Sequence, residues 1–300
     1  GKQLSDSKGA SAAISTEVAV LSMKRSMRGF VGPKDIFRNP EAIWRQFEPT
    51  NGDAPFDLVL SHSGNDFAVM GMHFKLGLYE HQSAGALQGL INLISSNPSL
   101  LETPDTIHEI KIVAYEPAFG IIGDPAKRDP NTRQSADHSM VYIISTMLRK
   151  AMDAAAARGN GNLAEGNDAW WKSLMLLPED YGRDALHHEG TRSLMKKIVF
   201  EHGGEEYGRR YPDGIPTSMM ITTKGGDVLD SGLVMYPSGH ARNTTADLDD
   251  ILNHKAASLG MIAMEDPTET IERFRSIGSA THEELLTLMS FDLATRDQID

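Results

Sequence analysis

Hydrophobic positions near the start of the chain recur at the spacing of a helix. Ile14, Val18 and Leu21 follow one another at steps of four and three residues, which place them on one face of a helix. The pattern predicts a helix over residues 10–28. Gly29 then ends it, because glycine favours the conformation that terminates helices.

The middle of the chain alternates between strand-like and helix-like patterns. We expect a strand over 67–75, a helix over 81–95, a strand over 106–115, a helix from 135 through 148, an exposed loop over 154–167, a helix passing into a strand over 192–200, and a hairpin of 218–223 with 228–235. Two or three helices are expected after residue 245. This order indicates an α+β middle flanked by helical ends.

The helical ends suggest a discontinuous domain. Residues 1–69 and 240–300 would pack together as parts of one helical domain, and residues 70–239 would form an α+β domain inserted between them. The predicted fold class is therefore mainly α with an inserted α+β domain.

Composition removes several classes of function. The chain of 300 residues has no cysteine, which excludes disulfides, thiol nucleophiles, cysteine-ligated zinc and cysteine-held iron–sulfur clusters. No apolar run reaches the roughly 18–20 residues that a bilayer span requires, so we expect a soluble protein that does not bind membranes. The net charge of −12 also opposes binding to nucleic acid.

Strong catalytic signatures are absent from the sequence. There is no HExxH zinc motif, no phosphate-binding loop of the Walker type and no G-x-S-x-G nucleophile elbow. The run His187-His188-Glu189 offers metal-ligand side chains, but adjacent side chains diverge and rarely meet on one ion. We therefore expect no metal there.

The most informative local feature is a lysine close to the start of a helix. Lys75 ends the predicted apolar strand, and Glu80, His81 and Gln82 open the next helix. A lysine there could point into a cleft beside the helix N-terminus, where anions are favoured. The alternative is a surface lysine with a capping histidine. Lys8 also precedes a helix, but alone it carries almost no information.

Four segments resemble the MmgE/PrpD family, which contains 2-methylcitrate dehydratases and cis-aconitate decarboxylases. The segments are Ser7 to Ala13 (SKGASAA), Gly29 to Pro33 (GFVGP), Phe74-Lys75 with His81 to Ala84 (HQSA), and Thr132 to Ile143 (TRQSADHSMVYI). The resemblance runs from about Lys8 to Gly239 and covers the C-terminal part of such enzymes. It implies a two-domain architecture with an active site between the domains, which agrees with the order of elements above.

By resemblance, we expect a hydro-lyase that dehydrates 2-methylcitrate to 2-methyl-aconitate in the methylcitrate cycle of propionate catabolism. Lys8 and Lys75 match two lysines of the family's site and would bind substrate carboxylates. His81 falls near a histidine of that site and is the local candidate for acid or base. The family implies no cofactor, a tricarboxylate substrate, a homodimer, and a location in the cytoplasm or the mitochondrial matrix.

Two other functions remain open. A cis-aconitate decarboxylase would share the fold and carboxylate recognition, although Phe119 stands where decarboxylases have a tyrosine. The second alternative is a noncatalytic fragment or interaction module. The chain begins at Gly1 and lacks the long N-terminal part of typical family members, so we expect a cleaved or partial product that is inactive alone.

Overall fold

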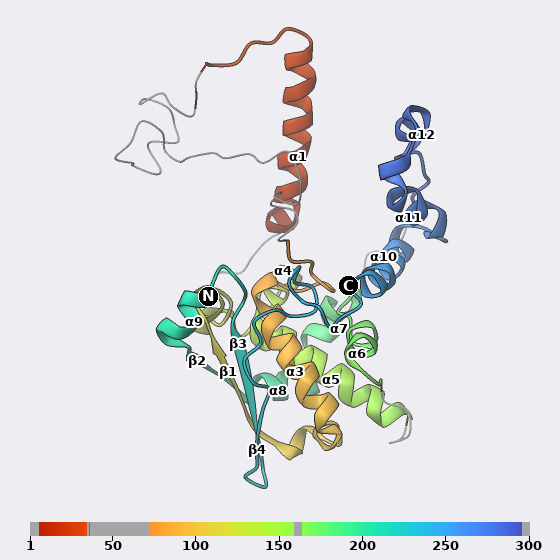
Figure 1. Cartoon of the computed structure of the whole chain (residues 1–300). Helices are drawn as coiled ribbons and strands as arrows, with labels where there is room; N and C mark the ends of the chain where they lie inside the picture. The colour runs from red at the N-terminus through yellow and green to blue at the C-terminus, as the bar shows by residue number, and fades with distance from the viewer. Residues whose placement is uncertain (1–5, 35, 37–71, 159–163, 296–300) are drawn as a thin grey trace. The chain divides into compact units, whose positions relative to one another are not determined.

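The computed structural model describes residues 6–34, 36, 72–158 and 164–295 (Figure 1). These residues belong to two compact units, one before Met72 and one from Met72 onwards, and each is described by itself. The first unit contains helix α1 (Asp6–Met27), which confirms the predicted first helix. Gly29 follows it with a φ of +92°, the left-handed conformation expected after a helix. Ile14 and Val18 on this helix are exposed.

A four-stranded mixed sheet organises the second unit. Its strands are β1 (Ile107–Ala114), β2 (Ile198–His202), β3 (Thr217–Thr223) and β4 (Val228–Asp230), in the order β2-β1-β3-β4. β1 pairs in parallel with β2 and antiparallel with β3, while β3 and β4 form the hairpin. The strand predicted over 106–115 and the predicted hairpin are confirmed, with β4 shorter than expected.

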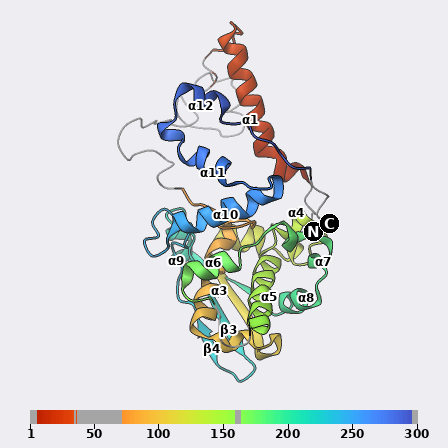
Figure 2. The same ribbon diagram turned by 90° about the vertical axis from the view of Figure 1, so that its right-hand side faces the viewer.

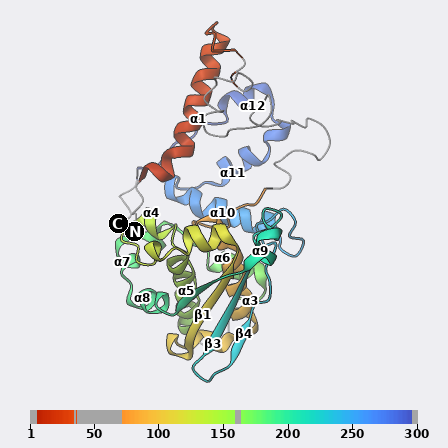
Figure 3. The same cartoon turned by 90° about the vertical axis from the view of Figure 1, so that its left-hand side faces the viewer.

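Helices cover one face of this sheet. Helix α3 (Ala84–Ser96) packs against β3, and α5 (Met140–Arg158) lies on the same side in the views of Figures 1, 2 and 3. The covered face carries Ile110, Ile112 and Met219, each fully buried, because alternate strand residues point to the same side. This face and the two helices form the hydrophobic core.

Shorter elements complete the second unit. They are 3₁₀ segments at His81–Ser83, Pro98–Leu101, Pro104–Thr106, Pro125–Lys127, Pro178–Tyr181 and Ile277–Ser279, a π-helical turn at Ala118–Ile122, and helices α4 (Arg133–Ala136), α6 (Asn167–Ser173), α7 (Arg183–Leu186), α8 (Glu189–Met195) and α9 (Gly204–Arg210). The helix-then-strand expectation for 192–200 is confirmed by α8 and β2.

Three helices end the described chain, as predicted: α10 (Leu248–Ala263), α11 (Thr268–Arg275) and α12 (His282–Thr287). The side chain of Asp247 caps α10 by accepting a hydrogen bond from the backbone N–H of Asp250 at 3.0 Å. Helix α10 packs against α6, which attaches the C-terminal helices to the sheet-containing part. Among the described residues, no helix has the length and apolar character needed to cross a membrane.

Three local expectations differ from the structure. Helix α5 continues to Arg158 instead of ending in a loop near 154, because its alanine-rich end has high helix propensity and Ala155 remains buried. The helix expected from 135 is divided into α4 and α5 around Asp137. In place of the end of a strand, the described residues 72–75 make an isolated bridge between His73 and His240, while residues 67–71 and 159–163 lie outside the described part.

The second unit is thus a helix-rich α+β structure. The predicted boundaries, with 1–69 and 240–300 in one helical domain and 70–239 inserted, stay a prediction.

Candidate functional site

The segment that carries Lys75 is held by hydrogen bonds on both sides. The backbone N–H of Leu78 donates to the carbonyl of Leu176 at 2.9 Å, and that of Glu80 donates to the carbonyl of Asp137 at 2.8 Å. Residues 75–80 therefore have a defined path without belonging to a helix or strand, since neighbouring segments satisfy their polar groups.

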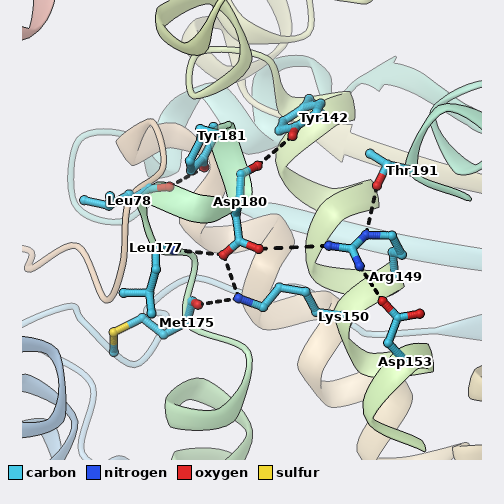
Figure 4. Close-up of polar contacts among 10 residues, drawn as sticks. All are labelled: Leu78, Tyr142, Arg149, Lys150, Asp153, Met175, Leu177, Asp180, Tyr181 and Thr191. Atoms are coloured by element: carbon cyan, nitrogen blue, oxygen red, sulfur yellow. Dashed lines mark hydrogen bonds and ion pairs between the residues drawn. The ribbon is translucent and has the colours of Figure 1, made fainter. Parts of the chain in front are cut away.

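A buried ion pair fixes the segment that supports this path (Figure 4). The carboxylate of Asp180 accepts from the Nζ of Lys150 at 2.6 Å and from the backbone N–H of Leu177 at 2.9 Å. The adjacent Tyr181 donates its hydroxyl to the carbonyl of Leu78. Asp180 is 5% exposed, so its interaction is little screened by water. The ion pair of Asp180 with Lys150, together with the hydrogen bond from Tyr181 to Leu78, thus connects α5 to residues 75–80.

A second segment crosses the first beside His73. Phe74 donates its backbone N–H to the carbonyl of Gly239 at 2.8 Å, and Ala241 donates to the carbonyl of Met72 at 3.1 Å. A Cβ atom at Gly239 would lie 2.0 Å from the carbonyl oxygen of Phe74, so only glycine allows this close approach. The crossing brings His240 next to His73, although the two are far apart in sequence.

Three histidines gather at this crossing. The ring of His73 lies 4.4 Å from that of His81 and 5.4 Å from that of His240, measured between ring centroids. Burial, reinforced by the charges of His81 and His240, lowers the pKa of His73 to about 3. Burial also lowers the pKa of His81 and of His240. We therefore expect three neutral imidazoles near pH 7, each with an acceptor nitrogen.

His73 is unusual because both of its ring nitrogens are buried and neither has a hydrogen-bond partner among the described residues. A buried polar group without a partner is costly, and such groups are rare in folded proteins. The cluster therefore has unused capacity to bind a polar group or a water molecule.

Two lysines lie beside the histidines. Lys255 on α10 donates its Nζ to the carbonyl oxygen of Lys75 at 2.5 Å. Burial lowers the pKa of Lys255, and the charge of Lys75 lowers it further. The charge of Lys75 also contributes to the lowered pKa of His81. The Nζ of Lys255 thus lies beside the backbone of Lys75, although the two residues are far apart in the sequence.

An acidic side chain completes the cluster. Burial raises the pKa of Glu80, while a hydrogen bond from the backbone N–H of Gln82 at 2.8 Å and the charges of His138, Lys75 and Lys127 oppose that rise. Tyr115 lies near enough to feel the carboxylate.

Tyr115 adds a neutral hydroxyl. Burial, followed by the nearby Tyr211 and Glu80, raises its pKa above the usual value. Its hydroxyl is buried and has no partner among the described residues. At neutral pH it therefore remains a phenol that can donate a hydrogen bond.

This arrangement combines positive charge with groups that can exchange protons. The lysines can bind carboxylates, the neutral histidines can accept protons, and a carboxyl group with a raised pKa can donate one. Within the described part of the chain, no group of three or more His, Cys, Asp or Glu side chains is placed to hold a metal ion.

No protein-family model and no curated protein sequence matches this chain. The functional assignment therefore depends on the residues and their geometry.

The residues predicted from the sequence have different outcomes. The charge of Lys75 contributes to the lowered pKa of His81, which belongs to the histidine cluster; their roles in a shared site stay a prediction. Lys8 is an exposed residue of α1 in the other unit, so its predicted meeting with Lys75 stays a prediction. Phe119 lies in the π-helical turn, with its ring centroid 5.3 Å from that of His202.

Sequence reasoning missed several members of the cluster, namely His73, Glu80, Tyr115, His240 and Lys255. Glu80 adjoins the predicted His81, and His240 follows a turn marked by Pro237 and Gly239; these were the only available local signals. Lys255 gives no signal, because an isolated lysine on an amphipathic helix is usually a solvated side chain.

Proposed function

We propose that this chain belongs to a hydro-lyase that dehydrates 2-methylcitrate to 2-methyl-aconitate in the methylcitrate cycle, without a cofactor. The observation that carries the proposal is the gathering of Lys75 and Lys255 with neutral His81 and the protonatable Glu80. A tricarboxylate needs cationic partners, and its dehydration needs both a proton acceptor and a proton donor. The resemblance to the MmgE/PrpD family supports the same assignment.

The proposed chemistry assigns a direction to each proton. Neutral His81 accepts the proton from the carbon next to a substrate carboxylate, and the electron pair of that C–H bond forms the new double bond. The C–O bond on the neighbouring carbon breaks as Glu80 gives its proton to the leaving hydroxyl, which departs as water. Lys75 and Lys255 stabilise the negative charge that grows on the substrate carboxylate as the proton leaves.

The proposal also includes the family's two-domain architecture, its homodimer and its location in the cytoplasm or mitochondrial matrix. In that architecture, 1–69 and 240–300 form the helical domain and Lys8 contributes a further cation to the site. Exposed apolar side chains support such packing: Leu21 on α1, and Phe274 and Leu286 on the C-terminal helices, would otherwise remain in water.

Tricarboxylate binding and turnover test the proposal. Citrate and 2-methylcitrate binding would be measured by calorimetry, and turnover by the absorbance of the unsaturated product. Replacing Lys75 by alanine should weaken binding by roughly tenfold or more, since a hydrogen bond to a charged group contributes about 1.5–3 kcal/mol. Lys224→Ala is the matched control, because Lys224 lies in the turn between β3 and β4 and its Nζ pairs with the exposed Asp105 at 3.4 Å. Equal affinities for the two variants would remove Lys75 from the site.

The products separate the dehydratase from its alternatives. Release of carbon dioxide from cis-aconitate, without formation of 2-methyl-aconitate from 2-methylcitrate, would favour the decarboxylase. If residues 1–300 bind no tricarboxylate and have no activity while a longer form has both, the chain as given is a noncatalytic fragment.

A further inference from the structure

A buried glutamine lies in the middle of α3, a helix of the second unit that is mostly buried. Gln88 on α3 is 7% exposed, and its neighbours in sequence, Leu87 and Gly89, are also buried. Burying an amide among apolar groups is costly unless its donors and acceptor are satisfied. A side chain of this kind in a core therefore has a specific set of partners.

The oxygen of Gln88 receives three hydrogen bonds from two distant segments. Trp171 on α6 donates its indole N–H at 3.0 Å. Ser238 donates both its backbone N–H, at 3.1 Å, and its hydroxyl, at 2.7 Å. Ser238 is held through main chain and side chain at once, so its position and orientation are both fixed.

The amide nitrogen of Gln88 is used as well. It donates to the side-chain oxygen of Asn92 at 3.0 Å and to that of Asn167 at 2.7 Å. Asn167 in turn donates to the hydroxyl of Ser238 at 2.9 Å. Helices α3 and α6 lie side by side, as Figure 2 shows, and this network joins both to the segment of Ser238.

Ser238 precedes the glycine and histidine that form the crossing described above. The backbone carbonyl of Gly239 accepts a hydrogen bond from the backbone N–H of Phe74, and His240 forms an isolated β-bridge with His73. A shift of Ser238 would therefore move His240 and, through Phe74, the backbone next to Lys75. The tight approach at Gly239 leaves little room for compensation.

We propose that Gln88 is a positioning residue for His240 and for the Lys75 segment: its carboxamide sets the register in which the two segments cross. Gln88 does not touch the reacting atoms. This inference deepens the proposed function and rests on it for the identity of the ligand, whereas the positioning of His240 can be tested without it.

The experiment compares three variants of the full chain. Gln88→Met keeps the length of the side chain but loses every bond of the amide. Gln88→Glu keeps an acceptor oxygen for Trp171 and Ser238. Ile94→Val, at a fully buried site on the same helix, is the matched control for a loss of core stability.

Two readouts distinguish positioning from general stability. The ¹H–¹³C signal of the His240 imidazole, with its pH titration, reports the surroundings of the ring, and calorimetry with citrate reports the site. We expect Gln88→Met to shift the His240 signal and to weaken citrate binding by roughly tenfold or more, because small misplacements of binding groups are costly. Gln88→Glu should restore much of the wild-type signal, and Ile94→Val should change neither readout.

An unchanged His240 signal and an unchanged citrate affinity in Gln88→Met would overturn the inference. If that variant does not fold, Ser238→Ala, which removes one hydroxyl and leaves the backbone N–H in place, must still shift the His240 signal; if it does not, the inference is wrong. If the wild-type chain binds no citrate, the proposed function fails, and the histidine signal alone decides the role of Gln88.

Discussion

The ion pair between Lys150 and Asp180 allows a quantitative prediction about stability. Replacing Lys150 by methionine would leave the Asp180 carboxylate buried, with the backbone N–H of Leu177 and the guanidinium of Arg149, 4.0 Å away, as its remaining partners. The side chains of Lys150 and Asp180 are 20% and 6% exposed, so water can replace the lost charge only in part.

Removing one partner of a buried ion pair typically costs about 3–5 kcal/mol, and the partial exposure of Lys150 reduces this to about 2–4 kcal/mol. The measurement is urea unfolding followed by tryptophan fluorescence, because Trp170 and Trp171 are buried in the same unit. The control is Lys224→Met in the exposed pair with Asp105, which should change stability by less than about 0.5 kcal/mol.

A double variant separates the charge interaction from side-chain packing. Combining Lys150→Met with Asp180→Asn should cost less than the sum of the single changes, because the buried charge is then absent and an acceptor remains for Leu177. A cost below about 1 kcal/mol for Lys150→Met, or strict additivity in the double variant, would refute the reasoning from burial.

Three other results are expected. An unfolded histidine binds a proton near pH 6.5, whereas burial keeps folded His73 neutral down to about pH 3. The stability that depends on neutral His73 is therefore complete above pH 6.5 and is lost as the pH falls from about 6.5 to about 3. We expect His73→Phe to reduce the loss of unfolding free energy between about pH 7.5 and about pH 4.5 by on the order of 2 kcal/mol, measured by urea unfolding. Gly239→Ala should lower the melting temperature, while Gly208→Ala in α9, which has no neighbour within 4 Å, should stabilise by about 0.5–1 kcal/mol. Citrate affinity should fall with added salt, and Lys255→Ala should weaken this dependence in calorimetry, whereas an unchanged dependence would exclude Lys255 from the site.

The elements that the sequence predicted best are those whose burial repeats with a regular period. β1 alternates buried and more exposed residues over Glu109 to Ile112, and α5 has fully buried residues at Ile143, Ile144 and Met147, at helical spacing. Local turn chemistry also predicted the β3–β4 hairpin. Lys75 and His81 could be associated because only a few residues separate them.

The remaining cluster members depend on contacts between distant segments. His240 reaches His73 only through the crossing at Gly239, and Lys255 reaches Lys75 only because α10 packs on α6. Neither contact leaves a periodic pattern in the sequence. Gln88 is a similar case, since a polar residue within an apolar helix gives no indication of which donors will meet it.

The net charge of −12 is compatible with a polyanionic ligand because distance determines which charges matter. At physiological ionic strength, exposed charges are largely screened beyond about 8 Å, so acidic side chains far from the cluster contribute little. The Nζ of Lys255 lies 2.5 Å from the backbone carbonyl oxygen of Lys75, and the burial that lowers the pKa of Lys255 also reduces screening by water. A carboxylate placed beside Lys255 would favour its charged form and so oppose the lowering of its pKa. The mutual repulsion of the two lysines in the free protein thus becomes a preference for anionic ligands.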